Sequence, residues 1–183
     1  LWIGDVGISG INAVAEILTG KVNPSGSLVD TYCYDNFSAP AMWNFTPTIY
    51  EGYVEGGDVS AKAKSYMIYQ EGIYVGYKYY ETRYEDFVTG NGNAGDYAYG
   101  DIVAYPFGYG DSYTTFAYSN FNVTESDDAF TVTLKVTNTG KTFSGKETVQ
   151  IYFQSPYTAY DKANGIEKAA AEPVSYTHLT LPT

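Results

Sequence analysis

The first 34 residues carry the pattern of a strand, a helix and a second strand. Residues 1–3 form an apolar run that leads into a glycine-rich turn. Four apolar residues then recur at the i, i+3, i+4 and i+7 spacing of one helix face: Ile11, Val14, Ala15 and Leu18. Ser9 is the expected N-cap of this helix, and Gly20 is the expected left-handed residue at its end. With a further strand expected over residues 27–34, this order predicts one unit of an α/β layer.

The next stretch, residues 35–113, has weaker periodicity and holds most of the 21 tyrosines. Prolines and glycines punctuate residues 35–65, which predicts a long surface excursion with short structured pieces. Within residues 73–80, one set of alternating positions predicts a strand: Ile73, Val75, Tyr77 and Tyr79. Residues 89–101 are rich in glycine and asparagine, and they are expected to form a mobile loop. We interpret residues 35–113 as a linking region rich in tyrosine and glycine.

Beyond residue 113 the pattern changes to short alternating strands. Strands are expected over residues 116–123, 130–138 and 147–154. In the second, one face is apolar and the other polar, which predicts one buried and one solvated side. Short strands with polar turns favour a sandwich, but an immunoglobulin-like sandwich needs about 100 residues. Residues 114–172 are therefore expected to form a truncated all-β sandwich with unpaired strand edges.

Composition narrows the class of ligand. The chain has 183 residues, a formal net charge of −11 and 17% aromatic residues. Such a charge repels phosphate backbones and anionic lipid headgroups, so nucleic acid and membranes are poor partners and neutral ligands fit better. Cys33 is the single cysteine, which excludes an intrachain disulfide and leaves the compartment open. No run is long enough for a membrane span.

Both ends of the chain affect its interpretation. The sequence begins at Leu1 without methionine, in what reads as the middle of a strand, so we expect a fragment in which a missing signal peptide means nothing. At the other end, Pro173–Thr183 resembles the conceptual translation of a sequencing adapter, and we set it apart as an artefact. This removes His178, the only histidine. The remaining sequence offers no histidine for acid–base catalysis, metal binding or a triad.

Two loops could be mistaken for binding motifs. Residues 140–147 nearly match a phosphate-binding loop, but Glu147 stands where that motif needs serine or threonine, and a strand pattern follows where it needs a helix. A hairpin-like connection is expected instead. The oxygen-bearing side chains of the second loop are Asn91, Asn93, Asp96 and Asp101. They miss the spacing of a calcium loop and its closing glutamate, so a solvated loop is expected and no metal or cofactor is assigned.

Charged and aromatic residues of the linking region have two interpretations each. The densest charged cluster consists of Glu81, Arg83, Glu85 and Asp86. Paired carboxylates are what glycoside hydrolysis requires. However, Glu85 and Asp86 would point to opposite faces of a strand, and Arg83 can neutralise its neighbours, which favours a structural ion-pair cluster. The tyrosines can line a site for a neutral polar ligand, but more often such rings fasten loops onto a domain surface.

Several local patterns occur together in the order typical of one enzyme family. They are Gly4–Gly7 with the helix through Leu18, Gly20–Gly26, Glu71–Tyr80, Tyr105–Gly110 with Ser112–Phe116, and Val136–Gly140 with Gly145–Glu147. In this order they resemble glycoside hydrolase family 3, in particular its β-glucosidase-like members. The last run is similar to the fibronectin type III-like module of those enzymes. The resemblance covers residues 1–172.

The resemblance implies a parent enzyme with a barrel domain, an α/β sandwich domain and a fibronectin-like module. Residues 1–34 would then be the end of the α/β sandwich domain, residues 35–113 the linking region and residues 114–172 part of the module. Such enzymes remove terminal β-linked sugars by retention, using an aspartate nucleophile and a glutamate acid/base. Neither residue matches a position here, so no catalytic residue is assigned and the fragment is expected to be inactive. Its substrate would be a neutral oligosaccharide or β-glycoside.

An alternative from another class stays open. The chain could be a carbohydrate-binding or adhesion module that uses the tyrosine-rich region, without catalysis.

One departure from the family pattern also stands out, because Asp111 occupies a position that is usually leucine. An unpaired carboxylate would be costly to bury, so Asp111 is expected to be exposed or hydrogen-bonded.

Overall fold

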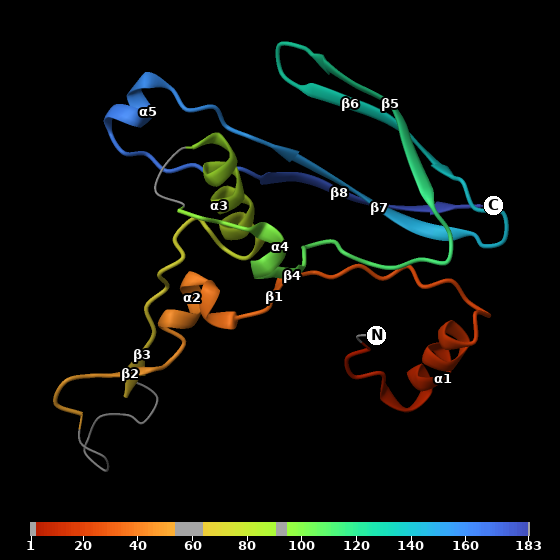
Figure 1. The fold of residues 1–183 in the computed structure, drawn as a ribbon, viewed down its shortest axis with the longest axis horizontal. Helices are drawn as coiled ribbons and strands as arrows, with labels where there is room; N and C mark the ends of the chain where they lie inside the picture. Colours follow the sequence, from red (N-terminus) through yellow and green to blue (C-terminus); the bar gives the residue numbers. More distant parts are fainter. Residues whose placement is uncertain (1–2, 54–63, 91–94, 183) are drawn as a thin grey trace. The chain divides into compact units, whose positions relative to one another are not determined.

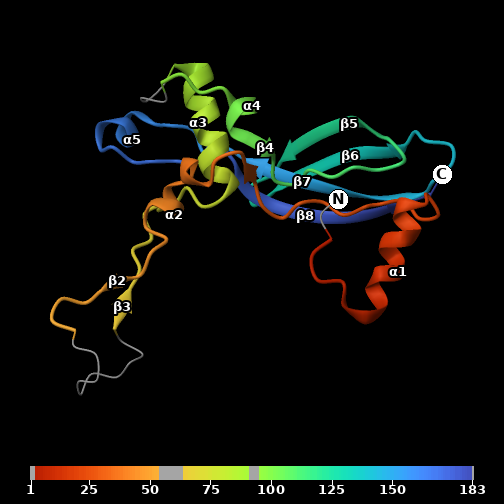
Figure 2. The same cartoon turned by 60° about the horizontal axis from the view of Figure 1, so that its bottom comes forward.

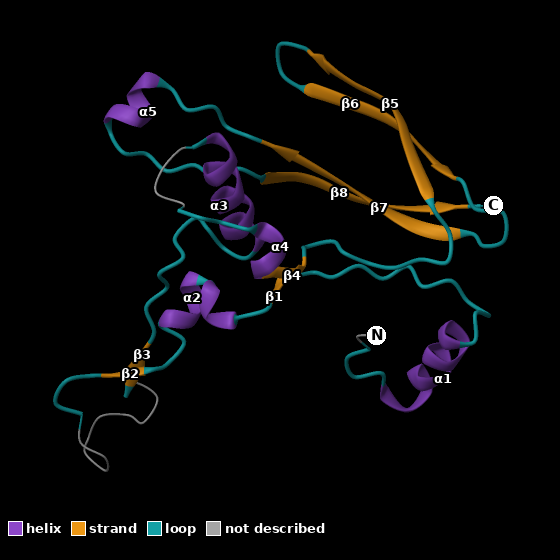
Figure 3. Cartoon of the chain, viewed as in Figure 1, coloured by secondary structure: helices purple, strands orange, loops and turns teal. Residues whose placement is uncertain are grey.

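The computed structural model describes residues 3–53, 64–90 and 95–182, which form a mixture of helices and strands (Figures 1 and 3). The residues group into two compact units, and each unit is assembled from separate stretches of sequence. The first comprises Leu1–Leu28, Gly108–Ile151 and Ser175–Thr183, and the second comprises Val29–Phe107 and Tyr152–Val174. The domain borders expected at residues 34, 113 and 172 stay predictions.

The first helix, α1, spans Gly7–Leu18 and begins three residues earlier than expected. Its N-cap is Val6, which makes no side-chain capping bond, so the prediction that Ser9 caps the helix is wrong. Gly7 takes a φ of 64°, a conformation that glycine tolerates readily, and it turns the chain into the helix before Ser9 is reached. The apolar run predicted as a strand over residues 1–3 lies mostly outside the described residues.

The end of α1 follows the prediction. Gly20 takes a φ of 71°, and its N–H donates to the carbonyl of Ile17 over 2.9 Å. The next N–H, of Lys21, donates to the carbonyl of Glu16 over 2.8 Å. These two bonds form a Schellman motif, which satisfies carbonyls that a helix end otherwise leaves unpaired.

The described part of the second unit contains short strands, one 3-10 turn and four α-helices. Strand β1 (Tyr32–Cys33) pairs antiparallel with β4 (Val103–Tyr105), and β2 (Thr48–Ile49) pairs with β3 (Ser65–Tyr66). The helices are α2 (Pro40–Trp43), after the 3-10 turn η1 (Asn36–Ser38), α3 (Tyr77–Thr89), α4 (Tyr99–Ile102) and α5 (Ala159–Ala163). The short pieces expected over residues 35–65 are present, whereas the strand expected over residues 27–34 is reduced to β1.

Helix α3 overturns the strand predicted over residues 73–80. The apparent alternation began with Ile73 and Val75, which are exposed and precede the helix. Gly76 then takes a φ of 59° and redirects the chain, and Gly90 ends the helix in the left-handed conformation. Residues 77–89 place Tyr80 and Thr82 in the interior of the unit. Other large buried side chains in this unit are Tyr97 and Val103.

The loop expected over residues 89–101 is in part helical. Residues 91–94 lie outside the described residues, but α4 forms at the end of the stretch. Its first turn is closed by the Asp101 N–H, which donates to the carbonyl of Ala98 over 3.0 Å. Figures 1 and 2 show α4 beside α3, and the rings of Tyr84 and Tyr99 meet edge to face with centroids 5.3 Å apart. This ring contact fixes a segment that composition alone marks as mobile.

The predicted strands beyond residue 113 are confirmed. Strand β5 (Phe116–Glu125) pairs antiparallel with β6 (Phe130–Asn138), and β7 (Gly145–Phe153) pairs with β8 (Glu172–Leu181). Along β6 the exposed and half-buried positions alternate, as expected. The chain from β6 to β7 connects two different sheets, so it is neither a hairpin between paired strands nor a phosphate-binding loop leading into a helix. Strand β8 includes most of the adapter-like segment, whose origin stays a prediction.

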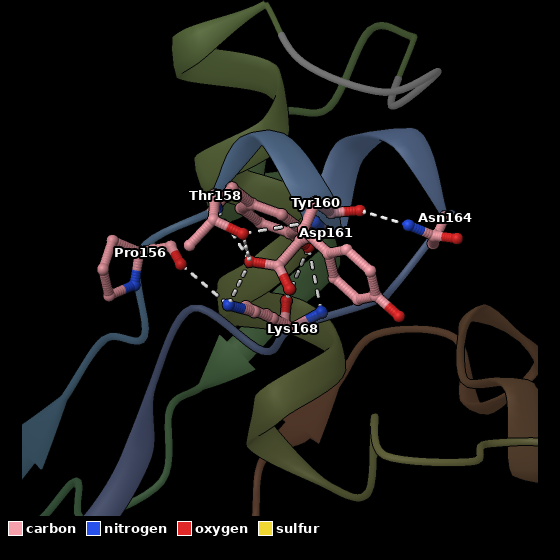
Figure 4. Close-up of polar contacts among 7 residues, drawn as sticks. Pro156, Thr158, Tyr160, Asp161, Asn164 and Lys168 are labelled. Atoms are coloured by element: carbon pink, nitrogen blue, oxygen red, sulfur yellow. Dashed lines mark hydrogen bonds and ion pairs between the residues drawn. The ribbon is translucent and has the colours of Figure 1, made fainter.

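A compact group of hydrogen-bonded residues closes the loop around α5 (Figure 4). The hydroxyl of Thr158 accepts from the Asp161 N–H, and the Asp161 carboxylate accepts from the Thr158 N–H, which together form a capping box. Lys168 donates to the same carboxylate over 2.7 Å and to the carbonyl of Pro156 over 2.7 Å. The pKa of Asp161 is lowered from 3.8 to about 2, first by the Lys168 bond and then by the two Thr158 bonds.

Candidate functional site

One face of α3 borders a shallow depression in the second unit. Its lining residues on the helix recur at i, i+3, i+4 and i+7: Glu81, Tyr84, Glu85 and Val88. Ala170 and Ala171 complete the lining, and the volume is about 370 Å³. This size lies near the lower end of the range for small-molecule pockets. In the sequence, these four residues already have the spacing of one helix face, and the prediction of a strand in this region overlooked that spacing.

The wall opposite α3 is fixed to the helix by polar bonds. The N–H of Ala170 donates to the hydroxyl of Thr82 over 2.9 Å, and Thr82 is itself buried. Lys78 donates to Glu172 over 2.5 Å, with both side chains mostly covered. Ala169, immediately before the wall, is 2% exposed. The alanines are therefore held against α3 from both sides along the chain.

The two carboxylates of the depression are oriented by neutral donors. The hydroxyl of Tyr99 donates to Glu81 over 2.6 Å. Burial, and then this bond to Glu81, raise the pKa of Tyr99, so its hydroxyl keeps the proton that it donates. The side-chain amide of Gln154 donates to Glu85. Each glutamate thus has one oxygen engaged by a neighbouring side chain, while the other oxygen can still accept a hydrogen bond.

The charged cluster predicted in this region is arranged differently from the expectation. Because α3 is a helix, Glu85 and Asp86 are about 100° apart around its axis, so the argument from opposite strand faces is wrong. Burial, and then Glu85, raise the pKa of Asp86, while Arg83 lowers it. The Arg83 guanidinium lies 5.5 Å from the ring centre of Tyr97, which is a cation–π contact. The ion-pair cluster predicted for these four residues stays a prediction.

Many tyrosines of the linking region serve structural contacts, as expected. The ring of Tyr77 lies 4.7 Å from that of Phe107 and 5.7 Å from that of Tyr152. Tyr80 is 3% exposed and shares a hydrogen bond of 3.1 Å with Ser38. Burial, its largest cause, raises the pKa of Tyr80 well above its ordinary value. Tyr84 is 44% exposed and lines the depression.

In the first unit, two of the stretches that carry the family resemblance, Gly20–Gly26 and Ser112–Phe116, meet at Asn23. Its side-chain oxygen accepts from the Tyr113 N–H over 2.7 Å and from the Ser112 hydroxyl over 3.1 Å. Its amide nitrogen donates to the carbonyl of Ser144 over 3.2 Å. Asn23, Asn138 and the residues that they bond, among them Thr114, are together called the polar junction.

The polar junction extends through a second asparagine. The Asn138 oxygen accepts from the Thr114 hydroxyl over 2.6 Å and from the Gly140 N–H over 3.0 Å. Its amide nitrogen donates to the carbonyl of Phe143 over 2.9 Å. Two asparagines therefore connect segments that are far apart in the sequence, and three of these segments belong to the stretches that carry the resemblance.

Asp111 follows the prediction made for it. The residue is exposed, and its carboxylate accepts from the hydroxyl of Tyr109 over 3.3 Å. Leucine is therefore not needed at this position to fill a buried site.

The described part of the chain has neither a cluster of metal-ligating side chains nor a membrane-spanning helix. Among those residues there is no group of three or more His, Cys, Asp or Glu that could hold a metal ion. Asn91 and Asn93 of the calcium alternative lie outside them. No described helix is long and apolar enough to cross a membrane.

Comparison with known proteins places the chain among glycosidases. It is 38% identical over 170 residues to β-glucosidase A of Butyrivibrio fibrisolvens, covering 85% of this chain and 17% of the relative. It is 35% identical over 152 residues to an exo-α-(1→6)-L-arabinopyranosidase of Bifidobacterium longum, covering 82% and 16%. β-Glucosidase 3B of Thermotoga neapolitana, solved in complex with α-D-glucose, superposes with a TM-score of 0.63 at 32% identity, covering 92% of this chain and 19% of that chain.

The coverage is strongly asymmetric. Each alignment takes in more than four-fifths of this chain, but the chain spans less than a fifth of the length of these relatives. No protein-family model matches the sequence. The resemblance to glycoside hydrolase family 3 is nevertheless confirmed: over most of its length, the chain is a homologue of a segment of the family's β-glucosidases.

Proposed function

We propose that the chain is a segment of a retaining β-glycosidase that removes terminal β-linked sugars from the non-reducing ends of oligosaccharides or glycosides. The observation that carries this proposal is the homology to β-glucosidases over 85% of the chain. The polar junction supports it, because three of the stretches that carry the resemblance, Gly20–Gly26, Ser112–Phe116 and Val136–Gly140, are joined in one hydrogen-bond network.

The proposed arrangement assigns each part of the chain to a part of the parent enzyme. Residues 1–34 would end an α/β sandwich domain, residues 35–113 would link it, and residues 114–172 would begin a fibronectin type III-like module. Support for the last assignment comes from the antiparallel pair of β5 and β6 and from strand β7, since consecutive strands are what part of a sandwich would supply. Proteolysis of the full-length protein tests these borders, because cleavage should concentrate in exposed linking segments.

The segment itself is proposed to be inactive, because no residue in it matches the family's nucleophile or acid/base. The test compares residues 1–172 with the full-length protein on an aryl β-glucoside. We expect turnover by the full-length protein and none by the segment above the rate in buffer. Hydrolysis by the segment that co-purifies with it through two different columns would contradict this proposal.

The sugar that the parent enzyme accepts is tested separately. The relatives named above include a β-glucosidase and an arabinopyranosidase, so a panel of aryl glucoside, xyloside and arabinopyranoside substrates is the appropriate assay for the full-length protein. We expect the ratio kcat/KM to be highest for the β-glucoside.

A second candidate function, a carbohydrate-binding module without catalysis, is favoured by the depression on α3, in which the ring of Tyr84 is exposed. The complete reading frame distinguishes the two. Flanking barrel sequence supports the enzyme, whereas further binding repeats without a barrel support the module.

A further inference from the structure

We propose that the depression on α3 binds a single neutral pyranoside ring, with the Tyr84 ring as its apolar platform and Glu81 and Glu85 as acceptors for the sugar hydroxyls. The proposal concerns binding by this chain, and it does not depend on whether the parent protein hydrolyses glycosides.

The first argument is the complementary chemistry of the lining. A pyranose has apolar C–H faces and a rim of hydroxyls, so it needs a flat apolar surface with acceptors or donors at its edge. Tyr84 offers a ring that is 44% exposed, and Val88, which is 63% exposed, extends the apolar surface along the helix. Glu81 and Glu85 lie on the same helix face, one on each side of that ring in sequence.

The second argument is the order imposed on these groups before any ligand binds. The ring of Tyr84 is fixed edge to face against Tyr99, and the hydroxyl of Tyr99 fixes Glu81. Gln154 fixes Glu85 in the same way. Ligand binding therefore costs less side-chain entropy here than it would at a site made of mobile groups.

The third argument excludes other ligand classes. Two carboxylates on a chain with a net charge of −11 repel phosphates and other anions. A calcium ion takes six to eight oxygen ligands, and the described residues hold no cluster of three or more potential metal ligands here. A small hydrated cation gains nothing from contact with the apolar ring and the alanine wall, whereas the apolar face of a sugar can pack against both.

The test measures binding of methyl β-D-glucopyranoside and cellobiose to the 183-residue chain by backbone amide chemical shifts. We expect saturable changes confined to residues 81–88, 99 and 170–171, with an affinity that added sodium chloride leaves unchanged. Tyr84→Ala should weaken binding about tenfold, because stacking on an aromatic ring contributes on the order of one such factor. Tyr69→Ala, at an 80% exposed tyrosine outside the lining, is the matched control and should bind like the parent.

A second variant separates the pyranoside from a cation. Val88→Asp changes an exposed position on the helix surface, so it should fold, and it replaces the apolar edge of the depression with a third carboxylate. Weaker sugar binding by this variant supports the proposal. Three results would overturn it. The first is no change in chemical shifts at the solubility limit of the sugar, and the second is equal binding of the sugar by Tyr84→Ala. The third is that the sugars leave the site unperturbed while methylammonium or calcium binds there in a salt-sensitive way that Val88→Asp strengthens.

Discussion

Replacing Asn23 by alanine is the most direct perturbation of the polar junction. The substitution removes three hydrogen bonds at once, to the Tyr113 N–H, the Ser112 hydroxyl and the Ser144 carbonyl. A neutral hydrogen bond contributes about 0.5 to 1.5 kcal/mol net, and a backbone group left without a partner costs more where water cannot reach it. Asn23 is only half-buried, so water can replace part of the loss. We therefore expect the free energy of unfolding to fall by about 2 kcal/mol.

Two measurements check this value. Urea unfolding followed by tryptophan and tyrosine fluorescence gives the free energy of unfolding of the variant and the parent. Hydrogen exchange at the Tyr113 amide gives the local effect, since this N–H donates to the side chain that is removed and its exchange should accelerate. A fall of about 2 kcal/mol in a chain of this length corresponds to a decrease of about 4 to 8 °C in Tm.

The controls separate the junction from a general effect of losing asparagine. Asn122→Ala changes an exposed asparagine of β5 in the same unit and should alter stability by less than about 0.5 kcal/mol. Asn23→Asp keeps an acceptor for the Tyr113 N–H but removes the donor to Ser144, so it should lie between alanine and the parent. If Asn23→Ala were as stable as Asn122→Ala and left exchange at Tyr113 unchanged, the junction would not hold these turns together.

Two further substitutions test other contacts. A Cβ at position 110 would lie 2.4 Å from the carbonyl oxygen of Gly26, so Gly110→Ala should destabilise the first unit by about 2 kcal/mol or more in urea unfolding, and a variant within about 0.5 kcal/mol of the parent would refute the close approach. The carboxylate of Asp161 has a pKa lowered to about 2 by Lys168 and Thr158, so its stabilising contribution is present above about pH 4 and is lost as the pH falls toward 2. Asp161→Asn should remove that part of the acid sensitivity in urea titrations at pH 2 to 5, and an unchanged pH profile would contradict the assignment.

Strand prediction succeeded where local periodicity was sufficient to decide the structure. The alternation predicted within residues 130–138 is seen as alternating exposure along β6, and the strands predicted over residues 116–123 and 147–154 are present as β5 and β7. Prediction failed at α3 because two exposed apolar residues ahead of the helix, Ile73 and Val75, imitated the start of a strand. The glycines at positions 76 and 90, both with positive φ, mark the true ends of the helix.

The candidate site could be predicted only in part, because its residues come from distant parts of the sequence. The stripe Glu81, Tyr84, Glu85 and Val88 is visible once a helix is assumed, but nothing in the local pattern places Ala170 opposite it. The same holds for the polar junction, in which Asn23 lies 90 residues from Tyr113 and 121 residues from Ser144. The family resemblance identified these turns by their residue types, and the hydrogen bonds explain why asparagine, which both donates and accepts, suits these positions.

Apolar periodicity and burial are separate properties in this chain. The predicted apolar stripe of α1 does form on one helix face, yet two of its members, Ile11 and Leu18, are 51% and 67% exposed. Phe121 and Phe130 on the β5–β6 pair are also mostly exposed. A stripe specifies which face can be buried, but burial also needs a second surface to cover that face. Truncating Leu18 would therefore remove little buried area, whereas a half-buried asparagine that joins three turns contributes more to the stability of the first unit.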